Sequence, residues 1–428
     1  MRIHKLIYKF SLLFKYKLYS FSSESSAIMD IKLLKNFINA KDENKKVLDD
    51  EFINLFKKKI GTGYALTFGA GRMAFFYLLK KLNYSEGKDI LLPGVTCSVM
   101  VNAVLKAGLN PIFYDIDEDS LGSSLTEIKK MITQNTCLVV AQHTYGIPCK
   151  IDEIKNYCNK NNIFLLEDCS LSYGSKYKDT YLGNFGDASL FSFDRSKTIN
   201  TFTGGLLYTN DNNLYNKLNE NYSSIPDLNK KKQLKIYRRI LLECLFNNPH
   251  FYSKLVFIEP ILKIFNIFQN SFLNSDYTEK FHDNYEYPCK YPTFLSQIGI
   301  LKLKKIDITF NNRKKFLLDI IDIFKKKNLL ESLPKSYFDK NNNIIPLRIL
   351  FYKKNKISIN KKLLKILDEK SFWYKGPIDS CTIDPTLFYY IKGSCKKIEE
   401  NNDNFINLPC NHNREHLSNL IGEVERKI

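Results

Sequence analysis

The sequence predicts an α/β fold in which helices cover a mostly parallel β-sheet. The chain has 428 residues, 44% of them hydrophobic, which is enough for a large core and two domains. Between residues 46 and 210, short apolar runs bounded by polar or turn residues alternate with longer segments of helical periodicity. Strands separated by helices indicate βαβ units, and continuous apolar runs indicate strands that are buried on both faces.

The elements follow in order along the chain. The expected strands are residues 89–92, 111–114, 137–141, 163–166 and 189–193. The expected helices in this region are residues 75–82, 99–107 and 151–159. Ligands of such sheets bind at the carboxyl ends of the strands, so the residues just after each apolar run are the candidate site residues.

We expect three parts in the chain. Residues 1–45 form a basic amphipathic extension. Residues 46–290 form the large domain, which includes a helical insertion at 225–290. Residues 291–428 form a smaller C-terminal α+β domain, because a long helical pattern begins there and leads into a mixed segment.

Two segments carry apolar residues that the sheet does not require. Residues 1–20 place apolar side chains at helical spacing between basic ones, and residues 240–268 are strongly apolar with few charges. The first segment is too short and too interrupted by lysines to span a bilayer. The second consists of two runs, residues 240–246 and 255–268, and neither run is long enough. Two alternatives remain open for each: a helix docked on the protein or a partner subunit, and peripheral contact with an anionic membrane surface.

Charge and cysteine content narrow the class of protein. The net charge is +19, but the 64 lysines and arginines are scattered and no nucleic-acid motif is present, so we expect no nucleic-acid partner. The 10 cysteines form no Cys-x-x-Cys pair, which argues against a zinc site or a disulfide framework, and no metal is expected. The chain is typical of a reduced, cytoplasmic protein, peripheral at the membrane if the second alternative above holds.

The motifs that carry chemistry begin with a carboxylate at a strand end. Asp168 follows the apolar run 163–166, where a side chain faces the ligand crevice. Pyridoxal enzymes need a carboxylate there to keep the pyridine nitrogen protonated. Acidic residues also end strands for reasons of turn geometry or capping.

A second motif lies at the next strand end. The apolar run 189–193 contains Ser192, a hydroxyl donor for a phosphate, and delivers Lys197 a few residues later. A lysine in a polar pocket near a phosphate forms an imine with an aldehyde cofactor. Gly204 and Gly205 follow, where the backbone turns tightly or approaches a ligand.

A third motif is the turn of Gly69 to Arg72, which runs into a helical pattern. Backbone N–H groups at a helix N-terminus bind phosphate, and Arg72 adds a charge-assisted contact. Such a turn is often only structural when it stands alone.

Together these motifs resemble the DegT/DnrJ/EryC1/StrS family of sugar aminotransferases. The segments that carry the resemblance are GAGRMAFFYLL, LLPGVTCSVMVNAVLKAGLNPIFYDID, HTYGIPCKIDEI, FLLEDCSLSYG, GDASLFSFDRSK and GGLLYTND. It covers residues 50–212 well and resumes more weakly at 291–307 and 404–424. The resemblance implies the type I pyridoxal-phosphate transferase fold, with 46–290 as the cofactor-binding domain.

The resemblance also implies roles for individual residues. Lys197 would hold pyridoxal 5′-phosphate as a Schiff base and move the substrate proton. Asp168 would pair with the pyridine nitrogen. The residues implied to hold the phosphate are Gly71, Arg72 and Ser192, and Cys97 occupies the position of an aromatic residue that commonly stacks on the cofactor ring.

Some positions depart from the family pattern. Leu171 stands where a hydrogen-bonding side chain is usual, Cys97 where a ring is usual, and Thr203 where a glutamate is usual. His143 and Tyr145 match the family, and we interpret both as structural.

The resemblance implies an aminotransferase that acts on a nucleotide-linked keto sugar in glycan or polysaccharide biosynthesis. Glutamate would be the amino donor, and the enzyme would be a homodimer. Relatives that dehydrate sugars have histidine in place of the lysine, so Lys197 argues against that reaction. The alternative is a divergent non-catalytic or regulatory protein with the same fold, which the departures at 97, 171 and 203 suggest.

Overall fold

The computed structural model describes residues 43–245, 286–352, 373, 376–378, 384–401, 404–410 and 414–427. The segment 1–20 and all but the first residues of 240–268 lie outside this part of the chain. The docking and membrane alternatives for them therefore stay predictions. Within the described part, no helix combines the length and the apolar character needed to cross a membrane.

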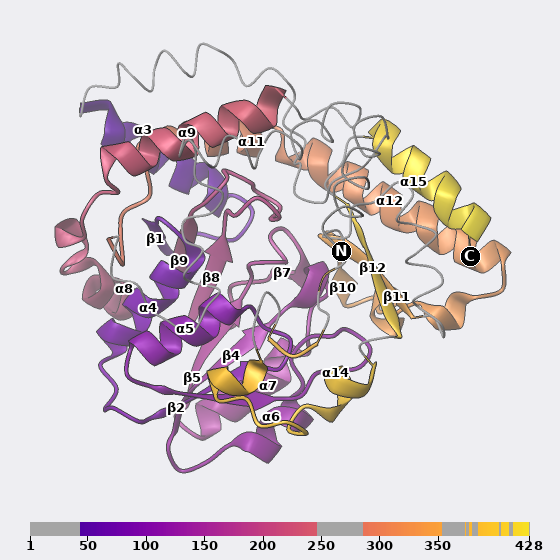
Figure 1. Ribbon diagram of the computed structural model, residues 1–428, viewed down its shortest axis with the longest axis horizontal. Coiled ribbons are helices and arrows are strands. Elements are labelled where there is room, and N and C mark those ends of the chain that lie inside the picture. Colours follow the sequence, from indigo (N-terminus) through magenta and orange to yellow (C-terminus); the bar gives the residue numbers. More distant parts are fainter. Residues whose placement is uncertain are drawn as a thin grey trace, which may run out of the picture.

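A seven-stranded sheet forms the centre of the larger part of the molecule (Figure 1). Its strands are β1 (Tyr64–Phe68), β2 (Asp89–Pro93), β3 (Asn110–Tyr114), β4 (Thr136–Gln142), β5 (Phe164–Asp168), β8 (Ala188–Ser192) and β9 (Gly205–Thr209). Their order in the sheet is β1-β9-β8-β5-β4-β2-β3. Every pair from β8 to β3 is parallel, whereas β9 is antiparallel to both of its neighbours. The prediction of a mostly parallel sheet is confirmed, and β9 is the one reversed strand.

The predicted strands and helices of this region are present within four residues of their expected bounds. The helices that lie between or beside the strands are α3 (Glu43–Lys57), α4 (Gly71–Leu82), α5 (Ser98–Lys106), α6 (Leu125–Met131), α7 (Ile151–Lys160) and α8 (Asn212–Asn219). The sequence analysis did not include β1 and β9, because their five-residue runs border glycine turns and look like parts of those turns.

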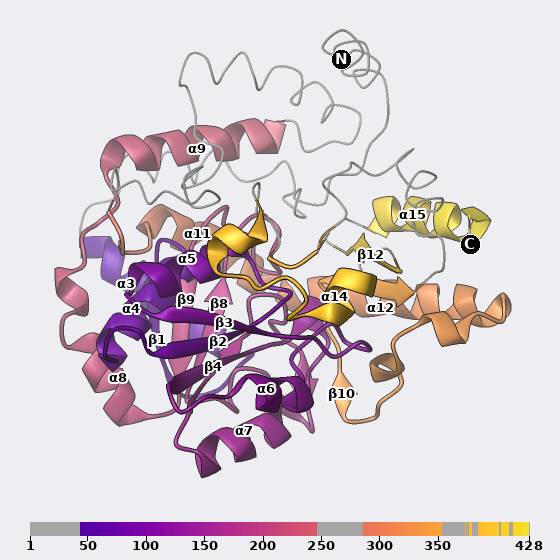
Figure 2. The same ribbon diagram turned by 60° about the horizontal axis from the view of Figure 1, so that its bottom comes forward.

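A cluster of aromatic rings supports the sheet next to β8. Phe56 stacks on Tyr173 at a centroid distance of 4.4 Å, and Phe52 meets Phe193 edge-on at 5.2 Å. The helix α11 (Thr293–Lys304) packs on α3, and a Cβ at Gly299 would lie 2.3 Å from the Phe52 ring. Close contact at this helix crossing therefore requires glycine. Figure 2 shows α9 (Lys230–Leu245) lying over α11.

The C-terminal part is built on a two-stranded antiparallel sheet. It pairs β11 (Arg348–Tyr352) with β12 (Phe405–Pro409), beside the long helix α12 (Ile306–Lys326) and α15 (Arg414–Lys427) (Figure 1). Its remaining elements are η4 (Leu330–Ser332), η5 (Lys335–Tyr337), η7 (Pro385–Phe388) and α14 (Lys396–Asn401).

Several contacts join this part to the larger part of the molecule, and two of them come from β10 and α12. The strand β10 (Asn342–Asn343) pairs with β6 (Lys176–Tyr177), which also pairs with β7 (Thr180–Tyr181). From α12, the ring of Phe310 lies 5.9 Å from that of Tyr173. The placement of α11 against α3 shows that residues just after 291 also contact the large sheet's helices.

Candidate active site

One cavity of about 200 Å³ opens at the carboxyl ends of the parallel strands. Asp168 is the last residue of β5, and Ser192 is the last residue of β8. Cys97 immediately precedes α5, and Lys197 lies in the loop after β8. The residues predicted from sequence that line this cavity are Gly71, Arg72, Cys97, Asp168, Ser192 and Lys197. The structure therefore brings all six together.

The start of α4 forms one end of the cavity. Its N-cap, Ala70, provides no side-chain hydrogen bond, and its first turn contains no acidic residue. A Cβ at Gly71 would lie 3.4 Å from the Cβ of Ser192, so the helix start and the hydroxyl-bearing strand end are in close contact. Exposed N–H groups, a hydroxyl and the Arg72 guanidinium form a site with the donors that a phosphate requires.

The glycine pair after the lysine loop keeps this end of the cavity open. Gly204 has a φ of +128°, in the region that favours glycine. A Cβ at Gly205 would lie 2.4 Å from the backbone N of Gly71. Thr203, which replaces the usual glutamate, donates a hydrogen bond from its hydroxyl to the Gly69 carbonyl at 2.8 Å. The tight turn and the close approach that the sequence suggested are both present.

The carboxylate of Asp168, at the end of β5, is part of the same lining. The residue is only 6% exposed, and its Oδ1 accepts a hydrogen bond from the backbone N–H of Ser170 at 2.9 Å. Leu171 is 3% exposed and also lines the cavity. A buried carboxylate beside an apolar side chain is suited to pair with a protonated ring nitrogen.

The loop that carries Lys197 is held by several contacts. The backbone N–H of Lys197 donates to the Asp194 carbonyl at 3.0 Å. Arg313 of α12 is 2% exposed and donates to the hydroxyl of Thr198 at 3.1 Å. The Nζ of Lys197 lies 5.3 Å from the ring centroid of Trp373. The lysine is thus oriented by contacts from both parts of the molecule.

Several residues of this site were not predicted from the sequence. Trp373, Gln142 and Arg195 line the cavity, and Arg313 supports the lysine loop from behind. Gln142 ends β4, so the rule that located Asp168 also applies to it. Trp373 is the single tryptophan of the chain, but nothing in its neighbourhood forms a motif.

The charges that line the cavity are mixed. Arg72, Arg195 and Lys197 face Asp168 and Asp194 in the lining. Three cations and two carboxylates leave a positive balance, which attracts anionic ligands such as phosphates. This local balance supports an anionic ligand more directly than the net charge of the whole chain does.

His143 lies behind the cavity and does not line it. Its ring is fully buried, and its Nε2 is 3.1 Å from the carboxylate of Glu167. That carboxylate also accepts hydrogen bonds from the backbone N–H groups of Gly183, Phe185 and Gly186. His143, Glu167 and Cys169 are close enough to hold a metal ion. The carboxylate oxygens are already occupied by these donors, so the arrangement is structural.

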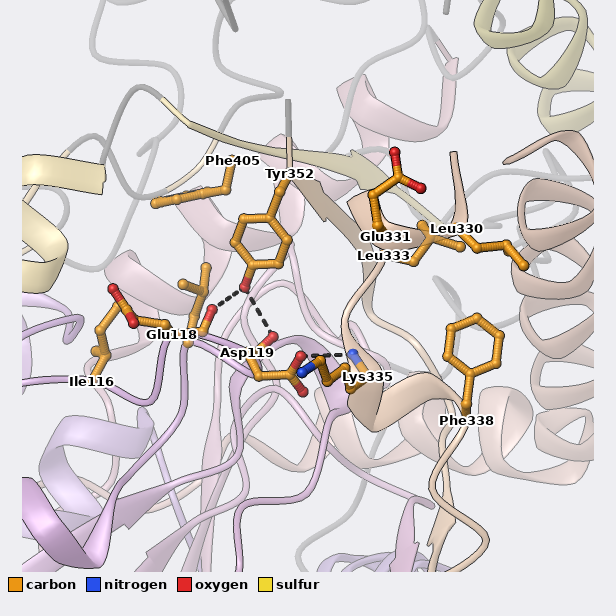
Figure 3. A pocket seen from close by; sticks show the side chains of 11 residues that line it. Ile116, Glu118, Asp119, Leu330, Glu331, Leu333, Lys335, Phe338, Tyr352 and Phe405 are labelled. Atoms are coloured by element: carbon orange, nitrogen blue, oxygen red, sulfur yellow. Dashed lines mark hydrogen bonds between the residues drawn. The ribbon is translucent and has the colours of Figure 1, made fainter. Parts of the chain in front are cut away.

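A second, larger cavity of about 660 Å³ lies away from these residues, between the loop after β3 and the C-terminal sheet (Figure 3). Its lining is mostly apolar, with Phe338 and Phe405 among the side chains. The Tyr352 hydroxyl donates to the Glu118 and Asp119 carbonyls, as Figure 3 shows. None of the predicted site residues lines it, and the hydrogen bonds of Tyr352 and Asp119 in its lining join the two parts of the molecule. Size alone therefore does not identify the reactive site.

The fold and the cavity define a class of protein. A mostly parallel seven-stranded sheet with one reversed strand, and with a lysine in the loop between β8 and β9, is the arrangement of the type I pyridoxal-phosphate transferases. Residues 33–235 match the DegT/DnrJ/EryC1/StrS aminotransferase family. This stretch is just under half of the chain, and over it the predicted resemblance to that family is confirmed.

Individual relatives are similar over part of the chain. GDP-perosamine synthase of Escherichia coli O157:H7 is 39% identical over 167 residues, which are 39% of this chain and 46% of that protein. A dTDP-4-dehydro-2,3,6-trideoxy-D-glucose 4-aminotransferase of Saccharopolyspora spinosa is 31% identical over 142 residues, 33% of this chain and 37% of that protein. The matched stretch spans less than half of the length of each relative.

Solved structures extend the similarity to almost the whole fold. An aminotransferase of Helicobacter pylori involved in the biosynthesis of pseudoaminic acid superposes with a TM-score of 0.65 at 20% identity, over 93% of this chain and 95% of that one. A GDP-4-keto-6-deoxy-D-mannose-3-dehydratase of E. coli with bound hydrated PLP gives 0.65 at 20% identity, over 96% and 99%. At these identities the likeness confirms the predicted fold.

Proposed function

We propose that the protein is a pyridoxal-phosphate-dependent aminotransferase that acts on a nucleotide-linked keto sugar in polysaccharide biosynthesis. The observation that carries the proposal is the convergence of Lys197, Asp168, Ser192 and the Gly71–Arg72 helix start on one cavity. The relatives named above include enzymes of GDP-linked and dTDP-linked sugars, which supports this substrate class.

The residues present fit the cofactor. The space above Gly71 would be filled by a Cβ, and the uncapped start of α4 offers N–H groups to a phosphate beside Ser192. The buried carboxylate of Asp168 provides the partner that a protonated pyridine nitrogen requires. Lys197 provides the amine that bonds to the aldehyde carbon.

Each residue of the site would have a separate role in the reaction. When bound, pyridoxal phosphate would supply an electron sink that makes the hydrogen on the reacting substrate carbon acidic. The amine of Lys197 would take the proton from the substrate carbon and return it, as a general base and then a general acid. Asp168 would hold the ring nitrogen protonated, and Arg72 with Ser192 would orient the phosphate. The positive lining with Arg195 favours anionic donors and nucleotide diphosphates.

Retention of Lys197 favours amino transfer over sugar dehydration, although a dehydratase is among the structures that share the fold. We further infer that glutamate is the donor and that the protein works as a homodimer. These points rest on the family resemblance. Light scattering on the purified chain measures the assembly, and a mass near that of a single chain would contradict the homodimer.

The experiment that tests the function is a spectral titration with pyridoxal phosphate. The native chain should develop a visible absorption band, and borohydride should fix the cofactor on Lys197, as peptide mass spectrometry would show. Lys197→Ala should lose both signals. Glutamate should bleach the band, and a panel of GDP-linked and dTDP-linked keto sugars should restore it.

A matched lysine separates a specific site from general lysine reactivity. Lys326 is a surface lysine at the end of α12, so Lys326→Ala should leave the band intact. No band in the native chain, or equal loss in both variants, would contradict an aminotransferase. The first result would favour the non-catalytic alternative.

A further inference from the structure

Trp373 brings an aromatic ring into the cavity from the C-terminal part of the chain. It is the only tryptophan in the sequence, and its ring centroid lies 5.3 Å from the Nζ of Lys197. The other residues of the cavity come from the large sheet and its loops. Among the residues that the structure describes, Trp373 is therefore the one lining residue that comes from beyond Gly204.

Two buried residues of the C-terminal sheet hold this tryptophan in place. The side-chain amide of Asn407, on β12, accepts from the backbone N–H of Trp373 at 3.3 Å and donates to its carbonyl at 2.9 Å. The guanidinium of Arg348, on β11, lies 5.1 Å from the indole centroid and donates to the Asn407 side chain. Asn407 and Arg348 are 2% and 3% exposed.

This arrangement fixes both the backbone and the ring of Trp373. A side-chain amide that pairs with both backbone groups of one residue acts like a short piece of β-ladder, and it sets that residue's position along the chain. A cation over the indole face favours one ring orientation. Because both holding residues are buried, the indole is preorganised beside Lys197 before any ligand binds.

Cys97 lines the same cavity at the start of α5 and has no ring. A thiol offers little stacking surface, whereas an indole offers the largest of any side chain. Any group bonded to the Nζ of Lys197 is brought within contact range of the Trp373 ring. The cavity therefore has its aromatic surface at 373 and none at 97.

We propose that Trp373 is the aromatic wall of this site, a binding residue that contacts the cofactor ring bonded at Lys197. Asn407 and Arg348 are its positioning residues. The inference rests on the proposed function, because it assumes that Lys197 carries the cofactor. It makes the C-terminal sheet part of the cofactor site.

The first test uses the native chain and its single tryptophan. Borohydride fixes pyridoxal phosphate on Lys197. Tryptophan is then excited at a wavelength that tyrosine does not absorb, and its emission is measured. Fixation should remove most of the emission. Asn407→Ala keeps the tryptophan but releases its backbone, so the same yield of fixed cofactor should quench less.

The second test measures the dissociation constant of pyridoxal phosphate from its absorbance. Trp373→Ala should weaken binding about tenfold, the effect of losing one well-packed aromatic contact. Trp373→Phe should stay within about threefold of the native value. Adding Cys97→Phe to Trp373→Ala should recover most of the loss, because the new ring enters the same cavity.

The outcomes separate this inference from the proposed function. Cofactor fixed on Lys197 with unchanged tryptophan emission would overturn the role of Trp373 and leave the function standing. An unchanged dissociation constant in a folded Trp373→Ala would do the same. No cofactor on Lys197 in the native chain would overturn the function and, with it, the inference.

Discussion

The large sheet and the C-terminal part contribute to the same cavity by different means. Residues of the large sheet reach it because strand ends and helix starts meet at one edge, as with Asp168 and Gly71. The C-terminal part acts through single contacts over long distances in sequence: Trp373 lines the cavity, and Arg313 holds the lysine loop through Thr198. The first part defines the chemistry, and the second sets how the reactive loop is covered and held.

The family match follows the same division, since it covers residues 33–235 and stops before the C-terminal part. A strand end that must present a carboxylate admits few changes. A covering side chain can come from several places, so its position can differ between relatives. Four predictions, ordered from the largest expected effect to the smallest, test whether the large sheet and the C-terminal part contribute in these different ways.

The rings beneath the site should matter most for stability. Phe56 is fully buried and stacks on Tyr173, so Phe56→Ala should lower the free energy of unfolding by about 3–5 kcal/mol. Urea denaturation followed by far-UV circular dichroism measures this. The control is Leu318→Ala on α12, where the side chain is 63% exposed and the change should stay within about 0.5 kcal/mol. An equal loss of unfolding free energy in the two variants would contradict a core that is centred on the aromatic rings beside β8.

Removing the charge at the strand end should disable the chemistry without releasing the cofactor. Asp168→Asn keeps the shape and the oxygen that accepts from Ser170, but it no longer holds the ring nitrogen protonated. We expect the glutamate half-reaction to slow by roughly 100-fold or more in stopped-flow absorbance. Asp194→Asn, in the same cavity, should have a much smaller effect. A fully active Asp168→Asn would contradict the assigned role.

The support that α12 gives to the lysine loop should have an intermediate effect. Arg313→Met removes the donor to Thr198 and should cost about 1–3 kcal/mol of folding free energy. It should also weaken cofactor binding several-fold, because the loop next to Lys197 loses a fixed point.

Thr198→Val provides the matched partner for this measurement. If the two residues act through their hydrogen bond, the double variant should cost less than the sum of the single ones. Strict additivity in both urea denaturation and cofactor titration would show that Arg313 does not act through Thr198.

The smallest effect concerns thiol labelling. Burial raises the pKa of Cys289, Cys395 and Cys410 to about 12, so these thiols stay protonated and unreactive near neutral pH. Cys97 is partly exposed in the cavity and should react faster with iodoacetamide. Bound pyridoxal phosphate should slow its labelling a few-fold in peptide mass spectrometry. Labelling of Cys97 that ignores the cofactor would place the ligand elsewhere.

Much of the fold and of the cavity lining could be predicted because both depend on local order. The apolar runs before Asp168 and Ser192 mark buried strands, and parallel strands bring their carboxyl ends to one edge. The strand β9 was missed because its glycine start looked like a turn alone, whereas in the fold Gly205 is in close contact with Gly71.

The rest depends on pairings that the sequence does not mark. Trp373 is held by Asn407, 34 residues away, and Thr198 by Arg313, 115 residues away. Neither pair has a fixed spacing or a flanking pattern, because the backbone between them passes through independent elements. Long-range side-chain contacts of this kind become visible only once the chain is folded.

The last two residues of β5, Glu167 and Asp168, are both acidic, but their side chains make different contacts. Successive side chains of a strand point to opposite faces. The side chain of Glu167 therefore lies on the face away from the cavity, where its carboxylate accepts hydrogen bonds from the turn of Gly183 to Gly186. The side chain of Asp168 faces the cavity. A strand slipped by one residue would put the longer carboxylate into the cavity and leave three backbone N–H groups without their acceptor. The hydrogen bonds between Glu167 and that turn therefore also hold β5 in the register that directs the Asp168 carboxylate toward the cavity.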